Sequence, residues 1–500
     1  MIRTDLIRPI PELLADAAER HPDKLAFRDA QRSLTYAELH RRTGRLAGHL
    51  RSLGVGAGDG VAIHLGNGVP YVESYLAIAR AGAIGVPINA QAAPPEVAHM
   101  VSDSGARVAI SDQAGAERLQ LERVVVVGGD FDSLAESDAD QGPTDDLGLH
   151  DPAWILYTSG TTGRPKGVVL TQHGFLWVVA ACWVPIVGYG RDDYALSPLP
   201  LFHSYALNVS VLAPLATGAS EYVMERFSTE ECVQLMREEP VTFFPGVPTM
   251  FHYLLHAARE EGLRARALRI CVSAGAIMPA SLNREFEDTL GVTLLDGYGI
   301  TETSTMVTQS WPTGDRPMGS CGLPLPGSAV RLVEPRSGRD VPPGERGELI
   351  VRGPHVMLGY HQREQETAEV MRDGWYHTGD EAVSDENGYL RITGRIKELI
   401  IRGGENIAPI EVEEVASRHE AIFDCAVVGR PHEDLGEVPV LFAVPKEDRE
   451  IDPEEVRRFC REQLSAFKVP AEVYVVDEIP KTGSGKIKRH ELARGIPASA

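Results

Sequence analysis

One segment of the sequence gathers hydroxyl side chains, glycines and a lysine closely enough to bind a polyphosphate. Residues 157–167 read YTSGTTGRPKG and follow a strand-like apolar run at 153–157. Glycines let successive backbone N–H groups face one anion, while the hydroxyls and Lys166 add donors and positive charge. The segment lacks the Gly-Lys-Ser/Thr ending of the Walker loop, so we predict a phosphate-binding loop of a different kind.

A second glycine-rich segment, KTGSGK at 481–486, lies near the C-terminus. Residues 481–494 hold five basic residues and one acidic residue in an otherwise acidic chain. On composition alone, this pattern is typical of a solvated basic tail.

Eight segments, in this order, resemble the motifs of the adenylate-forming (AMP-binding) superfamily, which includes acyl-CoA synthetases, peptide-synthetase adenylation domains and luciferases. They are TSGTTGRPKG at 158–167, PLFHS at 200–204, SAGA at 273–276, GYGITET at 297–303, GWYHTGD at 374–380, GRIKELI at 394–400, GGEN at 403–406 and PKTGSGKI at 480–487. The resemblance covers essentially the whole chain. It implies that a carboxylate attacks the α-phosphate of ATP, giving acyl-AMP and pyrophosphate, and that a thiol, usually of coenzyme A, then displaces AMP.

The resemblance implies how the triphosphate is held. Attack of one anion on another is opposed by charge repulsion, so cations and N–H donors must gather at the α-phosphate. The loop 158–166 would hold the β- and γ-phosphates, and Thr301 would donate to the α-phosphate. Glu302, together with Thr158, would bind Mg²⁺, a hard cation that prefers oxygen ligands.

The same resemblance assigns the residues that would bind the nucleoside and the thiol. Asp380 would accept hydrogen bonds from the ribose hydroxyls beside Arg395, and Tyr298 would stack on adenine. Gly275 would let the backbone approach the base edge. The predicted nucleotide- and thiol-binding residues are Thr158, Ser159, Gly160, Thr161, Thr162, Gly163, Lys166, Gly275, Ala276, Gly297, Tyr298, Gly299, Thr301, Asp380, Arg395, Gly403 and Gly404.

The resemblance also implies a moving C-terminal domain. Lys486 would bridge the substrate carboxylate and the α-phosphate during adenylation, so its domain must close over the large one. The domain would then rotate about Lys397 and bring Gly403-Gly404 beside the pantetheine channel. His203 would line the acyl entrance as a steric and polar gate, because a carboxylic acid is already ionised at pH 7 and needs no base. The predicted catalytic residues are Lys486, Thr301, Glu302, Lys397 and His203.

The segment around the acyl site predicts the class of acid. Amino-acid-activating relatives place an aspartate in the segment equivalent to Phe202–Leu207, and none is present here. Relatives that take malonate place an arginine where this chain has Gly297, which we expect to leave space. The residues that flank these positions are mostly apolar, which favours a medium- to long-chain fatty acid: Phe202, Tyr205, Val247, Met250, Ile300 and Met306.

The motifs leave three possible functions for the chain. The first is an acyl-CoA ligase, and the second is an acyl-AMP-forming ligase that loads the phosphopantetheine of an acyl carrier protein. The third, a non-enzymatic nucleotide-binding relative, is disfavoured because Lys166, Glu302, Asp380 and Lys486 are all present. The large insertion that marks many fatty acyl-AMP ligases is not apparent, which favours coenzyme A as the acceptor over a carrier protein.

The elements that must position these residues form an α/β pattern. Helical patterns at 36–53 and 70–81 alternate with short β-branched runs at 61–64, 108–111 and 124–127, which predicts largely parallel sheets. The acidic segment at 133–149 is predicted to be a loop. From about residue 320, short strands such as 329–333 predict a small β-rich subdomain, and a small, mobile α+β domain follows. We predict an N-terminal AMP-binding and acyl-binding domain over 1–394, a hinge at 395–397 and a C-terminal lid over 398–500.

Composition limits the partners and the location. The 49 Lys+Arg and 71 Asp+Glu give a formal charge of −22, which argues against nucleic acid or an anionic membrane as the main partner. The six cysteines include no CxxC pair, so reduced, buried thiols are expected. The first residues carry no apolar signal-peptide core, and the longest charge-free stretch, 195–220, contains three prolines. We therefore expect a cytoplasmic monomer or homodimer.

Overall fold

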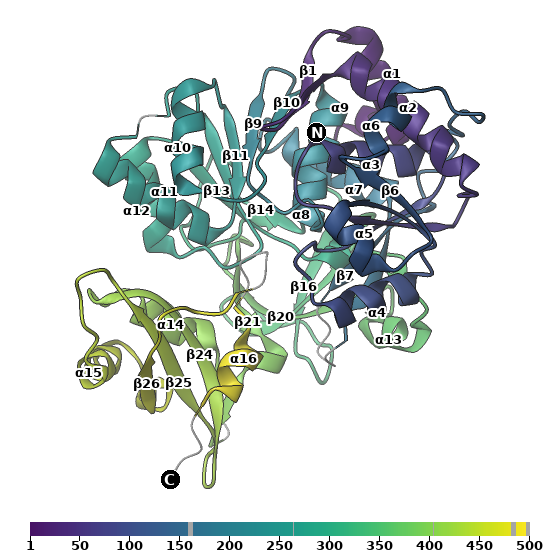
Figure 1. Cartoon of the computed structure of the whole chain (residues 1–500). Helices are drawn as coiled ribbons and strands as arrows, with labels where there is room; N and C mark the ends of the chain where they lie inside the picture. The colour runs from purple at the N-terminus through teal and green to yellow at the C-terminus, as the bar shows by residue number, and fades with distance from the viewer. Residues whose placement is uncertain (159–163, 264, 404, 482–486, 497–500) are drawn as a thin grey trace. The chain divides into compact units, whose positions relative to one another are not determined.

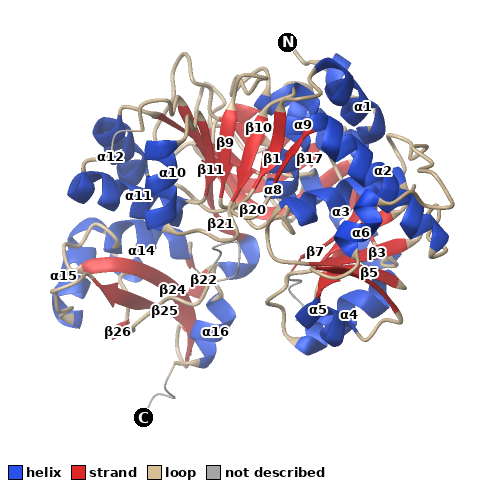
Figure 2. Cartoon of the chain, turned by 45° about the horizontal axis from the view of Figure 1, so that its top comes forward, coloured by secondary structure: helices blue, strands red, loops and turns tan. Residues whose placement is uncertain are grey.

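The computed structural model describes residues 1–158, 164–263, 265–403, 405–481 and 487–496. The chain divides into two compact units (Figure 1). The first comprises Met1–Met318, Gly322–Ala329 and Val351–Tyr376, and the second comprises Gly319–Cys321, Val330–Ile350 and His377–Ala500. The predicted α/β class, with its small β-rich sheet and small C-terminal α+β part, is confirmed (Figure 2).

The first unit contains a seven-stranded sheet. Its strands, in spatial order, are β18 (Gly359–Tyr360), β8 (Lys166–Thr171), β7 (Pro152–Thr158), β4 (Ile84–Pro87), β3 (Gly60–His64), β5 (Val108–Asp112) and β6 (Arg123–Val127). The strands from β7 to β6 pair in parallel, whereas β8 and β18 are added antiparallel at one edge. Four of the five parallel strands match runs predicted from the sequence, at 61–64, 108–111, 124–127 and 153–157, because strands buried on both faces are apolar throughout. Strand β4 was not predicted.

The first unit also contains a nine-stranded sheet. Its order is β15 (Leu323–Pro324), β14 (Thr308–Gln309), β13 (Thr293–Tyr298), β12 (Ile270–Ser273), β11 (Phe243–Gly246), β9 (Tyr194–Ser197), β10 (Ser220–Val223), β1 (Leu25–Arg28) and β2 (Ser33–Thr35). The central strands from β13 to β1 are parallel, and the strands at both edges are antiparallel.

The helices of the first unit cover these sheets. They are α1 (Ile10–Arg20), α2 (Tyr36–Ser52), α3 (Val69–Arg80), α4 (Pro94–Ser104), α5 (Gln113–Leu119), α6 (Phe131–Glu136), α7 (Gln172–Val178), α8 (Ser204–Leu207), α9 (Ala213–Thr217), α10 (Thr229–Glu238), α11 (Pro248–Glu261), α12 (Ala280–Leu290) and α13 (Glu364–Val370). Helix α2 begins where the sequence predicts, because Thr35 and Glu38 form a capping box at its first turn.

Two hydrophobic cores hold the nine-stranded sheet. On one face, Leu196 and Cys271 pack with Phe251 and Phe286 of α11 and α12, and α10 joins the same cluster (Figure 2). A larger core unites residues of α1, α2 and α3 with residues of both sheets. Both clusters include strand residues of the nine-stranded sheet, so the sheet is packed against helices through two cores. This packing makes the ends of its strands rigid supports for a site.

Two further sheets hold five strands each. One has the order β16 (Ala329–Val333), β17 (Arg346–Arg352), β20 (Trp375–Ser384) and β19 (Met371–Arg372), with β21 (Leu390–Arg395) paired to β20. The other has the order β23 (Glu405–Ile407), β22 (Ile400–Arg402), β25 (Gly436–Pro445) and β24 (Ile422–His432), with β26 (Glu472–Val475) paired to β25. Helices α14 (Pro409–Ala416), α15 (Pro453–Gln463) and α16 (Arg489–Arg494) belong to the second unit.

The structure corrects one sequence-based boundary and adds one feature. The segment 133–149 is not wholly a loop, because α6 extends to Glu136 and its Phe131 and Ala135 are buried. Two π-helical segments, η2 (Val179–Trp183) and η3 (Asn208–Leu212), had no signal in the sequence. All six cysteines are free and buried, as expected. Among the described residues, no helix is long and apolar enough to cross a membrane.

Candidate active site

Four neighbouring parallel strands of the nine-stranded sheet end in segments predicted to bind substrate. Strands β13, β12, β11 and β9 lie side by side in this order, and their last residues are Tyr298, Ser273, Gly246 and Ser197. In open α/β sheets, ligands bind beyond the carboxyl ends of the strands. The topology therefore gathers the motifs at 200–204, 273–276 and 297–303 at one edge of one sheet.

The GYGITET motif spans the end of β13 and the short 3₁₀ helix η4 (Thr301–Thr303). A Cβ at Gly299 would lie 1.5 Å from the carbonyl oxygen of Thr305, so only glycine fits this close approach. Ser304 and Thr305 have φ angles of 50° and 111°, in the left-handed region that side chains rarely adopt. The turn that carries Glu302 is therefore compact and under backbone strain.

Lys166 and Glu302 meet through a third residue, Tyr360. The Tyr360 hydroxyl donates a hydrogen bond to Oε1 of Glu302 at 3.1 Å. The Lys166 ammonium lies 5.3 Å from the centre of the Tyr360 ring, a cation–π distance. All three side chains are half-buried. A cation and a carboxylate, 136 residues apart in the chain, are thus brought to one place in the same unit.

The two ends of the phosphate loop are fixed by neighbouring strands. Thr158 and Lys166 are cross-strand partners in the antiparallel pair β7 and β8. Helix α4 supports both ends, because the Tyr157 hydroxyl donates to Oδ2 of Asp103 at 2.9 Å and the His99 ring lies 3.0 Å from the Pro165 carbonyl oxygen. The predicted residues Ser159, Gly160, Thr161, Thr162 and Gly163 lie outside the described residues.

The second unit holds the predicted ribose ligands. Asp380 and Arg395 are cross-strand partners on β20 and β21, and the Nε atom of Arg395 lies 3.0 Å from Oδ1 of Asp380. Lys397 follows in an exposed 3₁₀ turn. Gly403 has a φ of +59° and donates its N–H to the Leu435 carbonyl, between β22 and β23. Gly404 and Lys486 lie outside the described residues.

The acyl side of the site is largely aromatic. Tyr205 stacks on the buried ring of Trp183, with centroids 6.1 Å apart, and donates its hydroxyl to the Val272 carbonyl at 3.0 Å. The rings of Phe202 and His203 lie 4.4 Å apart. Each ring comes from the segment after β9 or from η2, so the sheet edge that carries the nucleotide motifs also carries these aromatic side chains.

The space expected beside Gly297 is already filled. Gly297 pairs with Gln309 across β13 and β14, and a Cβ at Gly297 would lie 2.2 Å from Cε of Met306 and 2.6 Å from Oε1 of Gln309. The sequence-based expectation of open space is therefore wrong for this conformation. These two atoms are the far ends of flexible side chains, and the backbone carbonyl oxygen of Thr308, at 3.1 Å, adds a third limit to the space.

Two family models match the chain. The model of the AMP-binding enzyme matches residues 14–361, and that of the AMP-binding enzyme C-terminal domain matches residues 411–486. The chain belongs to the AMP-binding enzyme family. It is an AMP-forming acid–CoA ligase, as the eight motifs predict, and its reaction uses ATP, coenzyme A and a small-molecule acid.

Similar proteins match this AMP-binding enzyme over nearly its full length. A feruloyl-CoA synthase from Amycolatopsis sp is 39% identical, with 95% of this chain and 97% of the relative covered. A long-chain-fatty-acid–CoA ligase from Yersinia pestis is 35% identical, with 98% and 95% covered. The crystal structure of ATP-bound MatB from Rhodopseudomonas palustris has a TM-score of 0.89 at 31% identity, covering 97% of this chain and 98% of that chain.

The donor set of the AMP-binding enzyme fits Mg²⁺. Among the described residues there is no group of three His, Cys, Asp or Glu side chains that could hold a metal ion alone. Mg²⁺ rarely needs such a cage, because it binds through one or two carboxylates plus the substrate phosphates. The carboxylate of Glu302 fits such a ligand, and among the described residues Tyr360 donates a hydrogen bond to its Oε1 atom.

Several residues around the site escaped the sequence analysis. Burial, and secondarily the Glu302 charge and a hydrogen bond to Tyr360, hold the pKa of Tyr376 well above its usual value. Burial raises the pKa of the Asp296 carboxyl, two residues before Tyr298, and lowers the pKa of His355 to about 4. Asp296 and His355 lie outside the eight motifs, and Tyr376 lies within GWYHTGD at 374–380 but was assigned no role, because the groups that surround it come from distant segments.

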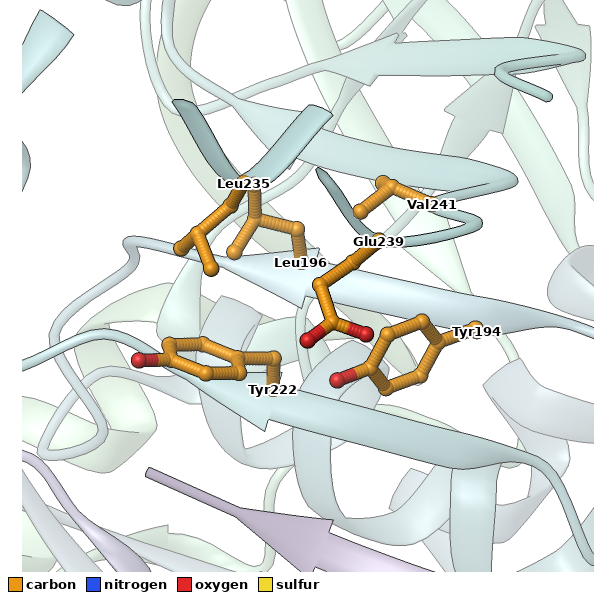
Figure 3. A pocket seen from close by; sticks show the side chains of 6 residues that line it. All are labelled: Tyr194, Leu196, Tyr222, Leu235, Glu239 and Val241. Carbon is orange, nitrogen blue, oxygen red and sulfur yellow. The ribbon is translucent and has the colours of Figure 1, made fainter. Parts of the chain in front are cut away.

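The pocket drawn in Figure 3 lies apart from these residues. It lies beneath α10 and is lined by Tyr194, Leu196, Tyr222, Leu235, Glu239 and Val241. Its only carboxylate, Glu239, is paired with Arg28 at 3.0 Å. No predicted site residue lines it, so we interpret it as a packing void.

Proposed function

We propose that this acid–CoA ligase activates a compact aryl acid of the ferulic acid kind. The observation that carries the proposal is the filling of the space at Gly297 by Met306 and Gln309, whose near atoms lie 2.2 and 2.6 Å from the missing Cβ. A pocket limited at this point suits a short, flat acyl body better than a long alkyl chain. The feruloyl-CoA synthase at 39% identity supports the same class.

The aromatic side chains support an aryl group in a second way. Aromatic rings prefer offset-stacked or edge-to-face contacts, which add about 0.5–1.5 kcal/mol beyond the area that they bury. Tyr205, stacked on Trp183, and Phe202 offer such contacts at the edge where the acid must lie. The buried amide of Gln309 adds a polar group beside Gly297 that a ring hydroxyl or methoxy group would meet.

The medium- to long-chain fatty acid predicted from the sequence remains the second candidate. It is favoured by the flexibility of Met306, whose terminal methyl group could move and lengthen the pocket. The ligase from Yersinia pestis at 35% identity supports it. Activation of either acid would use the same phosphate-binding residues. The two proposals differ only in how the acyl pocket holds the acid.

The residues keep the roles that the motifs predict. Lys166 and the hydroxyls of the phosphate loop would bind the β- and γ-phosphates, Thr301 the α-phosphate and Asp380 the ribose. Bound Mg²⁺, held by Glu302 and Thr158, would supply charge neutralisation at the phosphates. Lys486 would add the last positive charge when the domain beyond the 395–397 hinge closes. A cytoplasmic location is part of the same proposal.

The experiment is a product analysis with a matched set of acids. The purified chain is incubated with ATP, Mg²⁺ and one acid at a time: ferulate, cinnamate, benzoate, octanoate, dodecanoate or hexadecanoate. Each reaction contains either coenzyme A or a holo acyl carrier protein, and products are identified by mass. We expect feruloyl-CoA or cinnamoyl-CoA to form with the highest kcat/KM. A maximum at dodecanoate or hexadecanoate would favour the second candidate, and product on the carrier protein alone would contradict coenzyme A as the acceptor.

A further inference from the structure

We propose that Tyr360 is a positioning residue that sets the two charged groups of the adenylation site, Glu302 through its hydroxyl and Lys166 through its ring. The inference rests on the proposed roles of Glu302 and Lys166, and it adds a residue that lies in none of the eight motifs. Tyr360 would touch neither the acid nor the reacting phosphorus.

The fold fixes Tyr360 beside Lys166. Strand β18, which ends at Tyr360, pairs antiparallel with β8, which begins at Lys166. Tyr360 is the partner of Val168, and the N–H of the next residue, His361, donates to the Gly167 carbonyl at 2.7 Å. The backbone of Tyr360 is therefore held at the edge of the seven-stranded sheet, beside the start of β8, where its ring lies 5.3 Å from the Lys166 ammonium.

The same short segment also holds the turn that carries Glu302. The Met357 N–H donates to the Glu302 carbonyl oxygen at 2.8 Å, and the Ser304 hydroxyl donates to the His355 carbonyl oxygen at 2.8 Å. Residues 355–360 thus bind the phosphate-loop strand on one side and the Glu302 turn on the other. Tyr360 is the member of this segment whose side chain reaches a charged group on each side.

The hydroxyl of Tyr360 is oriented before it meets Glu302. Tyr376, only 3% exposed, hydrogen-bonds to Tyr360, which in turn donates to Oε1 of Glu302 at 3.1 Å. A hydrogen bond to one oxygen of a carboxylate restricts the rotation of that side chain. With Oε1 held in this way, the second oxygen of Glu302 is presented for a metal ion in one orientation.

The ring of Tyr360 acts on Lys166 differently. An ammonium within about 6 Å of a ring centre is attracted by the ring quadrupole, and the ring supplies no hydrogen-bond acceptor that would compete with phosphate. At 5.3 Å, Lys166 is held close to the site by a contact that uses none of its three N–H donors. The separation of hydroxyl and ring contacts allows two variants to test the two effects independently.

The experiment compares Tyr360→Phe, which keeps the ring, with Tyr360→Leu, which removes ring and hydroxyl. The matched control is Tyr194→Phe, because Tyr194 is a part-buried tyrosine of the same unit that lines the void of Figure 3 and no predicted site. Binding of α,β-methylene-ATP, which cannot be adenylated, is measured by calorimetry without metal. Binding of Mn²⁺ to the enzyme–analogue complex is then measured from the electron paramagnetic resonance of free Mn²⁺.

We expect Tyr360→Phe to weaken Mn²⁺ binding about tenfold, the scale of one hydrogen bond to a charged group, and to leave metal-free binding of the analogue unchanged. Tyr360→Leu should weaken both, and Tyr194→Phe neither. Wild-type Mn²⁺ affinity in Tyr360→Phe would overturn the role of the hydroxyl, and unchanged analogue affinity in a folded Tyr360→Leu would overturn the role of the ring. No acid is present, so a wrong assignment of the acid class would not alter these results.

Discussion

Asp380 and Arg395 face each other across two antiparallel strands and form an ion pair, with Nε of Arg395 3.0 Å from Oδ1 of Asp380. The Asp380 side chain is 5% exposed, whereas that of Arg395 is 47% exposed. The carboxylate is therefore the fixed member of the pair, and the guanidinium reaches solvent. A rigid carboxylate of this kind is suited to accept hydrogen bonds from two adjacent ribose hydroxyls. This is the role that the motif at 374–380 predicts for Asp380.

Replacement of Asp380 by Asn should remove the discrimination between ribose and deoxyribose. Each hydrogen bond to a charged acceptor contributes about 1.5–3 kcal/mol, so the wild-type chain should use 2′-deoxy-ATP at least about tenfold less well than ATP. We expect Asp380→Asn to use both nucleotides equally, with a raised KM for ATP. The measurement is acid-dependent pyrophosphate exchange with each nucleotide. Preserved discrimination in the variant would assign the ribose to another residue.

The acyl pocket should lengthen when Met306 is shortened. Met306→Ala removes the atoms that lie beside Gly297, and each additional methylene buried in the freed space contributes about 0.8 kcal/mol, or about fourfold. Relative to cinnamate, kcat/KM for acids longer by two carbons should therefore rise about fifteenfold. Met306→Leu, which keeps the volume, is the control. An unchanged ratio in a folded Met306→Ala protein would mean that Met306 does not limit the acid.

These residues illustrate what the sequence could and could not predict. The strand Ala329–Val333 has the bounds that the sequence predicts, because a local apolar run between turn residues decides it. The filling of the space at Gly297 could not be predicted, since it depends on how a hairpin returns Met306 and Gln309 to that glycine.

Tyr360 was missed for a related reason. It is 58 residues from Glu302, and its role depends on the pairing of β18 with β8, which no local pattern encodes. Motif resemblance identified Lys166 and Glu302 one at a time, but only the fold reveals the side chain between them. The residues that connect motif positions are therefore the part of the site that sequence reasoning finds last.

Glu221 should make stability depend on pH. Its side chain is fully buried on β10, burial holds the pKa of its carboxyl well above the usual value, and Tyr189 donates to it at 3.3 Å. The folded state therefore keeps a proton that the unfolded chain loses above pH of about 4.3, so this group destabilises the fold progressively as pH rises. We expect Glu221→Gln to raise the melting temperature more at pH 8 than at pH 5. Equal shifts at both pH values would contradict a buried, protonated carboxyl.

Lys486, which lies outside the described residues, should act in only one half of the reaction. Loss of a positive charge at the developing transition state should slow acyl-AMP formation by about 10²–10³-fold or more in Lys486→Ala. Thioester formation from supplied acyl-AMP and coenzyme A should continue at nearly the wild-type rate. Similar losses in both half-reactions would argue against two positions of the C-terminal domain.

We expect the enzyme to form an acyl-adenylate, at the sheet edge that carries Glu302, before any thiol acts. Exchange of labelled pyrophosphate into ATP, measured with ferulate and Mg²⁺ but without coenzyme A, tests it most directly. We expect rapid exchange that requires the acid and is lost in Glu302→Gln. Exchange that appears only after coenzyme A is added, or release of ADP and phosphate in place of AMP and pyrophosphate, would contradict it.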